Sequence, residues 1–483
     1  MKRLTATDFY RYIQCPHWPY WELYGDKADR RPLTAEQERR QADGLAHERE
    51  IVAAQFGEAE TVVAENDEDA VATTLRMMKE GVPIIYQGSL ADGDWFGRPD
   101  LLERMEGKST LGDWYYVPLD VKRSHELKKE HKAQLMFYAV LLERIQGRFP
   151  SHPAILNSDG ERIGFDASQF ELDFRDLLHE LERIREGEMP APVYRKSCED
   201  TSPWGKACFR LAHDRRDIAL LFNVDIRKLK ALRSLGIVTI DDAAELNPEA
   251  LEGQAPGLTL RGLEAVRRQA ISLTTQSVII RDPFVDPTEG MEIHFDIESH
   301  PPSDTDYLYG FWFPNGERQG YHAIIAEKPE DERKLWTEFL EWLRSLPEKY
   351  TVWHYAAYEP TRLMVLARRY ETEQDPYLLK FIGSFKDLKE YVADTAVFPV
   401  YFYSLKKIGQ FLGFAWEGDV KGGGESVTAF DDWLKTGKRA TLDAIVQYNR
   451  EDVRATAFLL DWLRQYARKP QSYAPPYPWT NPE

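Results

Sequence analysis

The segment "EIHFDIESHP", residues 292–301, predicts a β-strand that carries two carboxylates on one face. Apolar side chains alternate in it with His294, Asp296 and Glu298, which is the period of a strand with two unlike faces. Neighbouring positions on one face lie roughly 6–7 Å apart, so Asp296 and Glu298 could share a divalent cation. A solvated strand face has the same alternation. Segments elsewhere in the chain must therefore decide between a metal site and a solvated face.

The composition is that of a globular protein with several domains. The chain has 483 residues, of which 43% are hydrophobic, 12% aromatic and 29% charged; this length suggests two to four domains. No apolar run reaches the roughly 18 residues of a membrane span, and the N-terminus lacks an apolar signal core. Three cysteines cannot form a disulfide framework, which fits a reducing cytosol. We therefore expect a cytoplasmic protein without membrane contact.

The charge balance excludes one class of nucleic-acid binder. The chain has 62 basic and 80 acidic residues, a net charge of −18. Such a chain is not expected to coat nucleic acid nonspecifically. It can still be a nuclease, because phosphate contacts depend on local basic patches and metal sites require clustered acids. One basic patch is "KRSHELKKEHK", residues 122–132.

Periodicity and loop signals predict a multidomain α/β protein. Residues 1–210 mix helical and strand patterns, and two short amphipathic stretches around "LGIVT" suggest a helical segment. From residue 291 strands and helices alternate, as in an α/β domain. The predicted segments are 1–210, a helical segment 211–279, a Pro-containing linker 280–290, an α/β domain 291–470 and a Pro-rich, irregular tail 471–483.

Three later segments add acids to the first strand. In "TVWHYAAYEP" a short strand leads into a helix that begins near Glu359, and "FKDLKEYV" supplies Asp387. Residues 443–463 form a strongly amphipathic helix on which Tyr448 and Asp452 lie four residues apart, and therefore on the same face.

The order of these acidic motifs along the chain resembles that of the DEDD-type 3′–5′ exonucleases of the RNase H-like fold, in the branch with a tyrosine in the last motif. The resemblance implies a two-metal site with Mg²⁺ or Mn²⁺, which would activate a water and stabilise the leaving oxygen of a phosphodiester. Tyr448 would position or deprotonate that water. The second motif departs from the family pattern, because it reads "HYAAYE" with His354 and Glu359. The implied metal ligands are Asp296, Glu298, Glu359, Asp452 and, with a less certain role, Asp387.

The N-terminal half contains a second ordered set. Residues 86–104 predict a hairpin with Asp100 near its end, and "YYVPLDVKRS" predicts a strand with Asp120 and Lys122 on one face. The following helix places Gln134 and Tyr138 four residues apart on one face.

This set resembles the PD-(D/E)XK nucleases of the RecB-like branch, which have a restriction-endonuclease-like fold. The resemblance implies that Asp100 and Asp120 bind metal and that Lys122 stabilises the nucleophile or the developing phosphorane charge. His47, on an upstream helix, falls where the branch often has a metal-ligating histidine. Gln134 and Tyr138 match an accessory motif. An edge hairpin with solvated charges and a core helix is the alternative interpretation.

The cysteines allow two interpretations. Relatives in this branch hold an iron–sulfur cluster with one N-terminal and three C-terminal cysteines, and Cys15, Cys198 and Cys208 match three of these positions. Thr201 stands where the fourth is expected, and cubane clusters ordinarily require four thiolates. Either an iron–sulfur cluster is completed by another ligand, or these are three ordinary thiols.

As a whole the chain resembles the RecB-like nuclease family that joins a PD-(D/E)XK domain to an RNase H-like exonuclease domain. The segment 211–279 resembles a helix-hairpin-helix element, although a spacer of packed helices fits equally well.

The resemblance of the whole chain to the RecB-like nuclease family implies a metal-dependent nuclease acting on DNA, single-stranded or with an accessible end. With no Walker motif in the chain, a helicase would be a separate partner. The alternatives are a scaffold with degenerate nuclease sites and an RNA-processing 3′–5′ exonuclease.

Overall fold

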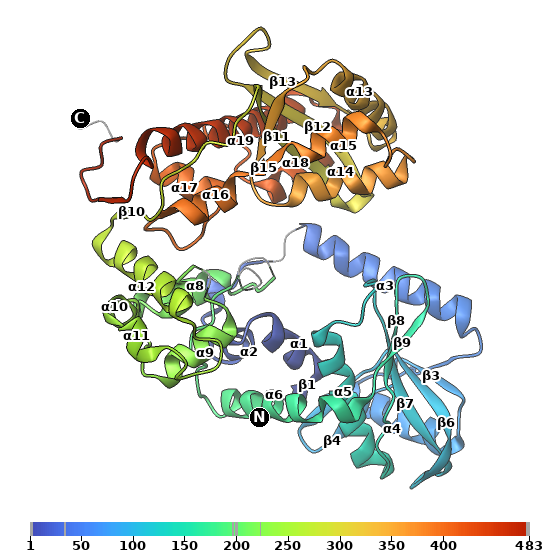
Figure 1. Cartoon of the computed structure of the whole chain (residues 1–483). Helices are drawn as coiled ribbons and strands as arrows, with labels where there is room; N and C mark the ends of the chain where they lie inside the picture. The colour runs from blue at the N-terminus through green and yellow to red at the C-terminus, as the bar shows by residue number, and fades with distance from the viewer. Residues whose placement is uncertain (1–2, 33–34, 196–197, 199–200, 223, 480–483) are drawn as a thin grey trace. The chain divides into compact units, whose positions relative to one another are not determined.

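The computed structural model describes residues 3–32, 35–195, 198, 201–222 and 224–479, except for the side chains of residues 35–37 and 39–43. It divides into two compact units, Met1–Ala219 and Leu220–Glu483, which are described separately (Figure 1). Both mix helices with sheets, which confirms the predicted multidomain α/β class. The helices after residue 220 belong to the second unit.

The first unit contains one large mixed sheet and one small sheet. The large sheet has the order β2-β3-β6-β7-β8-β9, and the small sheet has the order β1-β5-β4. The strands are β1 (Leu4–Thr5), β2 (Glu60–Thr61), β3 (Ile84–Tyr86), β4 (Leu90–Asp92), β5 (Trp95–Gly97), β6 (Leu101–Ser109), β7 (Gly112–Val121), β8 (Ala154–Leu156) and β9 (Arg162–Gly164). The helices are α1 (Ala6–Gln14), α2 (His17–Tyr24), η1 (Lys27–Asp29), α3 (Ala35–Gln55), α4 (Asp67–Glu80), α5 (Lys129–Gln146), η2 (Ala167–Phe170), α6 (Glu171–Arg185), α8 (Gly205–Asp214) and η3 (Ile218–Leu220).

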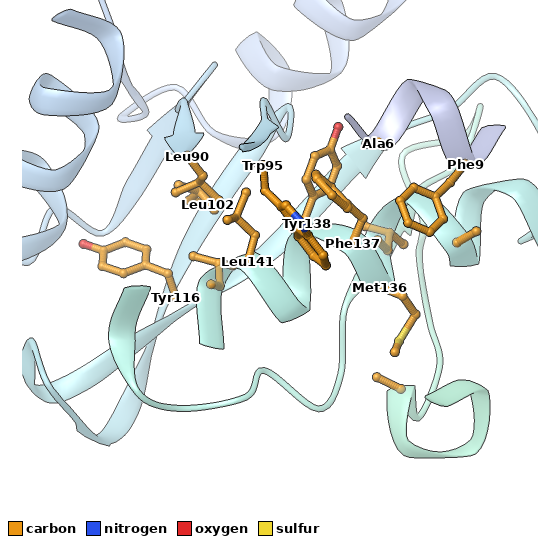
Figure 2. Close-up of a cluster of buried hydrophobic side chains, with 14 of the residues drawn as sticks. Ala6, Phe9, Leu90, Trp95, Leu102, Tyr116, Met136, Phe137, Tyr138 and Leu141 are labelled. Atoms are coloured by element: carbon orange, nitrogen blue, oxygen red, sulfur yellow. The ribbon is translucent and has the colours of Figure 1, made fainter. Parts of the chain in front are cut away.

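Helix α5 is the crossover between the parallel strands β7 and β8 and forms the centre of the core. Its apolar side chains pack with α1 and the small sheet (Figure 2). Phe137 stacks on Trp95 with ring centroids 5.0 Å apart. Gly97 makes room for this arrangement, because a Cβ at this position would lie 2.9 Å from the Tyr138 ring. The other face of the large sheet packs against α3 through Val52.

The second unit contains a five-stranded sheet of order β13-β12-β11-β14-β15 and a small sheet of order β16-β10-β17. The strands are β10 (Val278–Ile280), β11 (Met291–His300), β12 (Thr305–Phe313), β13 (Gly320–Ile325), β14 (Tyr350–His354), β15 (Phe385–Asp387), β16 (Ala396–Val397) and β17 (Gln471–Tyr473). The helices are α9 (Ile226–Ser234), α10 (Ile240–Glu245), α11 (Pro248–Leu251), α12 (Leu260–Thr275), η4 (Pro301–Ser303), η5 (Pro329–Asp331), α13 (Glu332–Arg344), α14 (Tyr358–Arg369), α15 (Pro376–Gly383), α16 (Leu388–Thr395), α17 (Leu405–Phe411), α18 (Gly423–Thr436) and α19 (Arg439–Tyr466).

Helices cover both faces of the five-stranded sheet (Figure 1). The apolar side of β11 packs on α13, α14 and α15 through Ile293, Phe295 and Ile297. The opposite face lies under α18 and α19. Since side chains alternate along a strand, Asp296 and Glu298 point to the α18–α19 face, as the sequence predicted.

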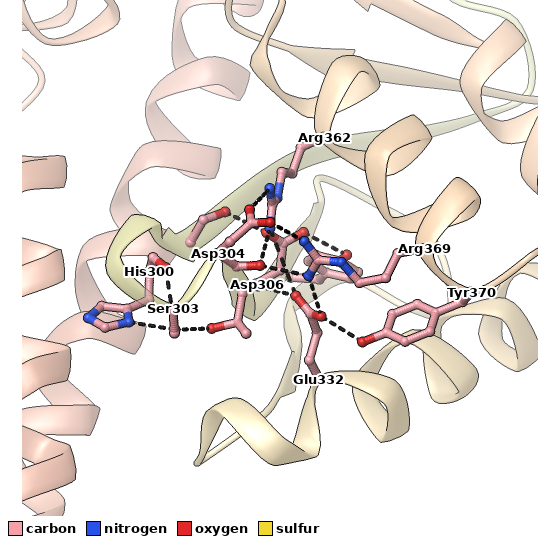
Figure 3. A network of polar contacts seen from close by, with 11 residues as sticks. His300, Ser303, Asp304, Asp306, Glu332, Arg362, Arg369 and Tyr370 are labelled. Carbon is pink, nitrogen blue, oxygen red and sulfur yellow. Dashed lines mark hydrogen bonds and ion pairs between the residues drawn. The ribbon is translucent and has the colours of Figure 1, made fainter. Parts of the chain in front are cut away.

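A buried network of ion pairs anchors α14 to the start of β12 (Figure 3). Arg362 donates to Asp306 at 2.5 Å and to Asp304 at 2.7 Å. Arg369 donates to Glu332 at 2.7 Å, and the Asp306 backbone amide donates to the same carboxylate at 2.6 Å. Asp306 and Glu332 are buried, so their charges require these partners. The network fixes the helix whose first turn carries Glu359.

Two segments are more ordered than the sequence suggested. The tail was expected to be irregular, but Gln471–Tyr473 forms β17 and pairs antiparallel with β10. Trp479 then packs on Trp462 of α19, with ring centroids 5.2 Å apart. The predicted linker forms polar contacts with the rest of the unit, since Arg464 donates to Asp286 at 2.7 Å. The prolines of the linker prevent regular secondary structure there, but they do not prevent tertiary contacts.

Candidate active sites

The four acids expected in the C-terminal site come from three elements. Asp296 and Glu298 lie on β11, Glu359 lies in the first turn of α14, and Asp452 lies on α19. Burial raises the pKa of Asp296 well above its usual range, and the charges of Glu298, Asp452 and Glu359 raise it further. Asp296 also shares a hydrogen bond with Glu359. The structure therefore brings the acids of all three predicted motifs into one electrostatically coupled cluster.

The cluster holds more negative charge than its surroundings can stabilise. Burial, followed by the charge of Asp452, raises the pKa of Glu298 to about 8. Burial likewise raises the pKa of Asp452 to about 6 and raises the pKa of Glu359. Groups that repel one another in this way are stabilised as carboxylates by a nearby cation. Hard divalent cations prefer oxygen ligands, so the chemistry of these donors suits Mg²⁺ or Mn²⁺. Among the described residues, no three of these carboxylates have oxygens that all lie within 4.8 Å of one another, so binding would draw them closer together.

Each carboxylate is also held by a polar side chain from elsewhere in the unit. Such outer partners orient metal ligands and are part of a metal site's design. The sequence did not predict these pairings, because they depend on tertiary packing. The pairs are Asn449 with Asp296 at 2.7 Å, Ser426 with Glu298 at 2.8 Å, His354 with Glu359 at 3.0 Å and Trp416 with Asp452 at 2.6 Å.

Asp387 has a local structural role. Its Oδ1 accepts from the backbone amide of Lys389, which caps α16, and from that of Ala356 at 2.8 Å. Ala356 has a positive φ of 71°, a strained conformation for alanine. It lies in the turn between β14 and α14 that presents Glu359. Asp387 thus holds this turn, and its role as a metal ligand stays a prediction.

Tyr448 lies one helical turn before Asp452 on α19 and hydrogen-bonds with it. Burial and the charge of Asp452 raise the pKa of Tyr448 above its usual range. The phenol therefore remains protonated at neutral pH. It can donate a hydrogen bond and orient a neighbouring group, but it is poorly suited to remove a proton.

The predicted N-terminal acids meet across two neighbouring strands. Asp120 lies in β7, and Asp100 lies immediately before β6. The Asp100 backbone amide donates to Asp120 at 3.2 Å, and the Val121 amide donates to the Asp100 carboxylate at 2.7 Å. Lys122 Nζ lies 2.9 Å from Asp120 Oδ2. The expected Asp, Asp-x-Lys set is therefore one contiguous cluster.

The electrostatics of this cluster parallel those of the C-terminal site. Burial and the charge of Asp120 raise the pKa of Asp100 to about 8. Burial lowers the pKa of Lys122, but the charges of Asp120 and Asp100 outweigh this effect and raise it above the usual value. Lys122 therefore stays positively charged beside the two acids. A further cation would release the proton held by Asp100.

The remaining predicted residues lie on the helices that cover the sheet. On α3, His47 Nε2 is buried without a hydrogen-bond partner among the described residues. Its neighbour Glu48 accepts from Tyr86 at 3.0 Å, and its charge also raises the pKa of Asp100. Glu48 was not among the predicted site residues, yet its charge couples it to the acid pair.

Gln134 and Tyr138 lie one turn apart on α5, as predicted. The Tyr138 ring is part of the hydrophobic core, and its hydroxyl donates to the Arg98 carbonyl at 3.2 Å (Figure 2). The nearby charges of Asp120 and Asp100 contribute to raising its pKa, after burial. Tyr138 therefore borders the acid cluster from the core side, whereas Gln134 is partly exposed.

The cysteines do not fit a cubane cluster. All three are buried, and Sγ of Cys15 lies 3.4 Å from Sγ of Cys208. In a cubane each thiolate binds a different iron, which separates the sulfurs more widely than ligands of a single ion. The fourth cysteine position is Thr201. Neither the number of thiols nor their spacing therefore supports the iron–sulfur interpretation.

Comparison with protein families agrees with this geometry. Residues 9–208 match the model of the PD-(D/E)XK nuclease superfamily. Residues 293–464 match the model of the RNase_H superfamily. The chain contains one domain of each superfamily. Both predicted acid clusters lie inside the matched ranges, which supports a nuclease that takes a nucleic-acid substrate.

A comparison with curated proteins found no match. Within the described parts of the chain, no helix has both the length and the apolar content needed to cross a bilayer.

Proposed function

We propose that the protein is a metal-dependent nuclease with two sites, a 3′–5′ exonuclease site in the RNase_H superfamily domain and a RecB-like site in the PD-(D/E)XK domain. The observation that carries the proposal is the presence, in each domain, of clustered acids in which burial and neighbouring carboxylates raise the pKa of an aspartate, Asp296 in one domain and Asp100 in the other. When bound, divalent cations would activate water and stabilise the leaving oxygen of a phosphodiester.

In the C-terminal site, the chain's own residues would hold and orient the reacting groups. Asp296, Glu298, Glu359 and Asp452 supply the carboxylate oxygens. Tyr448 remains protonated and orients the attacking water by a hydrogen bond. Trp416 and Asn449 limit the rotation of the carboxylates that they contact, which preserves the geometry that in-line attack requires.

In the N-terminal site, Asp100 and Asp120 would bind metal, and Lys122 would stabilise negative charge that develops on the phosphoryl oxygens. The charge of Lys122 is maintained by the two acids, so it is present before substrate binds. The substrate that we propose is DNA, single-stranded or with an accessible end. The acidic net charge of the chain argues against nonspecific coating of nucleic acid.

The test uses the full chain with Mg²⁺ or Mn²⁺ and single-stranded DNA or RNA that carries a fluorophore at its 5′ end. Asp296→Asn and Asp120→Asn inactivate one site each, and the double variant is the control for contaminating nucleases. We expect Asp120→Asn to retain stepwise shortening of DNA, which a 3′-terminal phosphorothioate block should slow. We expect Asp296→Asn to lose this shortening.

Other outcomes would favour the two alternative functions. Degradation of RNA alone, abolished by Asp296→Asn, would indicate an RNA-processing exonuclease. Absence of cleavage with either metal, while nucleic acid still binds, would indicate a scaffold. Activity of the double variant that separates from the chain on size-exclusion chromatography is contamination, whereas activity that co-elutes with the chain would refute the assignment of both sites.

A further inference from the structure

The cysteines of the first unit form a compact buried cluster with a histidine that the sequence patterns did not single out. The ligand atoms of Cys15, His17 and Cys208 all lie within 4.8 Å of one another. Within the described residues this is the one group of three or more Cys, His, Asp or Glu side chains that meets this spacing. Cys15 precedes α2, His17 begins α2, and Cys208 lies on α8, so the cluster joins two segments far apart in the chain.

The orientation of His17 suits a metal ligand. Its Nε2 lies 2.8 Å from the Pro190 carbonyl oxygen. A carbonyl oxygen can only accept, so Nε2 must carry the proton, and the lone pair of the ring is then on Nδ1. Metal-ligating histidines commonly donate their other N–H to a carbonyl or carboxylate in this way.

The spacing of the sulfurs fits a single ion. Zinc–sulfur bonds of about 2.3 Å in a tetrahedral site place two thiolates ~3.8 Å apart. The observed Cys15–Cys208 separation of 3.4 Å is close to that value. Cys198 lies outside the 4.8 Å spacing of the other three ligands, but it packs in the same buried group of side chains, and its thiol interacts with that of Cys15. The Cys198 thiol donates to the Val193 carbonyl at 3.3 Å, a bond that it gives up when it binds the ion. With Cys198 as the fourth ligand, the site offers three sulfurs and one nitrogen, a common set for structural zinc.

The surroundings of the cluster are closed and apolar. Trp204 is buried against the cysteines, and Trp18 and Trp21 pack at their edge. Structural zinc sites bind four protein ligands and leave no position for substrate, whereas catalytic zinc sites keep one open. We propose that Cys15, His17, Cys198 and Cys208 bind one structural Zn²⁺ ion, which fastens the start of α2 to α8. The three thiols release their protons as the ion binds, whereas His17 binds through the lone pair of Nδ1 and keeps the proton on Nε2.

The first test measures metal content of the full chain, purified without a histidine tag or chelators. We expect about one zinc per chain, little iron, no inorganic sulfide and no absorption shoulder near 400 nm. His17→Ala and Cys208→Ser should lose most of the zinc, while His17→Cys should retain it, since cysteine also binds zinc. His152→Ala, which changes an exposed histidine, is the matched control and should keep zinc.

The second test begins with the unmodified chain, so its main result does not depend on the folding of a variant. The unmodified full chain is loaded with Co²⁺ in place of zinc, and we expect the visible bands of tetrahedral cobalt with thiolate ligands. His17→Cys should shift these bands, which tests whether His17 binds the ion directly. Iron with stoichiometric sulfide would overturn the proposal. So would a Cys15–Cys208 disulfide in the intact mass, or the absence of metal from freshly purified protein.

Discussion

Gly310 lies directly opposite Asp296 in the β11–β12 ladder, and Asn449 occupies the space that a Cβ at residue 310 would take. The Asn449 amide donates to Asp296 from this position, and its oxygen accepts from Tyr321 at 2.9 Å. A glycine inside a strand often marks such a close approach. The absence of one methyl group thus allows α19 to hold the first carboxylate of the site.

This relationship predicts that Gly310→Ala impairs the C-terminal site. The new Cβ would overlap the Asn449 side chain and displace it from Asp296, so we expect metal-dependent 3′–5′ shortening to fall by about 10–100-fold. The assay is the one described above in the Asp120→Asn background. Gly383→Ala is the control, because a Cβ there meets no atom within 4 Å among the described residues. Equal activity of the two variants would contradict the proposed role of Asn449.

The pH dependence of stability should reveal the acid clusters. Glu298 has a pKa of about 8, against an ordinary value of 4.5. Between these values the folded protein holds a proton that the unfolded chain releases, so the free energy of unfolding falls as pH rises. We expect the melting temperature of the metal-free protein to fall by several degrees from about pH 5 to about pH 8.

A metal ion and a substitution should each reduce this pH effect. Mn²⁺ should restore the melting temperature at the higher pH, because it stabilises the carboxylate form. Glu298→Gln should make the profile less steep without metal, since its amide does not titrate, while Asp296 and Asp100 retain part of the effect. A profile that rises with pH in the metal-free protein would argue that these acids are not coupled as described.

Trp416 provides a test of the outer partners of the metal ligands. Trp416→Phe replaces the indole with a smaller ring and removes the donor to Asp452, so we expect metal affinity to weaken by about 10–100-fold. Because Trp416 is buried, a modest loss of stability should accompany this change. The measurement is activity against Mn²⁺ concentration in the Asp120→Asn background. Trp433→Phe is the control, because it removes an indole donor that bonds the Glu327 carbonyl. This variant should leave the dependence of activity on Mn²⁺ concentration unchanged.

Replacement of Lys122 should lower the rate of phosphodiester cleavage more than it weakens the binding of nucleic acid. Lys122→Met keeps the length of the side chain but removes the charge beside Asp120. We expect cleavage by the N-terminal site to fall by about 100-fold or more. The variant is assayed in the Asp296→Asn background, with Lys129→Met on the exposed start of α5 as the control. An unchanged rate would mean that Lys122 only balances the charge of Asp120.

A substitution of Arg362 tests how strongly its ion pairs anchor α14 to the start of β12. Arg362→Met leaves Asp306 buried without its ion-pair partner, and breaking such a pair costs about 3–5 kcal/mol. We expect a lower midpoint of chemical denaturation for the second unit. Arg333→Met, which changes an exposed arginine on α13, should shift the midpoint little.

The sequence predicted the elements better than it predicted their contacts. Alternation in β11 and the four-residue spacing on α19 placed Asp296, Glu298, Tyr448 and Asp452 correctly on their elements, because local periodicity determines which face a side chain occupies. The partners Trp416 and Asn449 could not be predicted in this way. They reach the acids through tertiary packing, which leaves no local pattern.

Two other features illustrate the same limit. Asp387 ends β15 and precedes the first residue of α16, a position that fits both a metal ligand and a helix cap, and only the structure shows the cap. His17 adjoins Cys15 in "CPHW", but a lone histidine beside a cysteine is common. Its importance becomes visible only when Cys208, 193 residues from Cys15, lies beside it.

The pairing of β10 with both β16 and β17 determines how the second half of the protein can be studied in isolation. A fragment of residues 291–470, cut at the borders that the sequence suggests, would remove two of the three strands of this sheet and the aromatic residues that cover the end of α19. We expect such a fragment to be insoluble when expressed. One that starts at Leu220 and keeps Trp479 retains the whole compact unit and is the better choice for crystallisation.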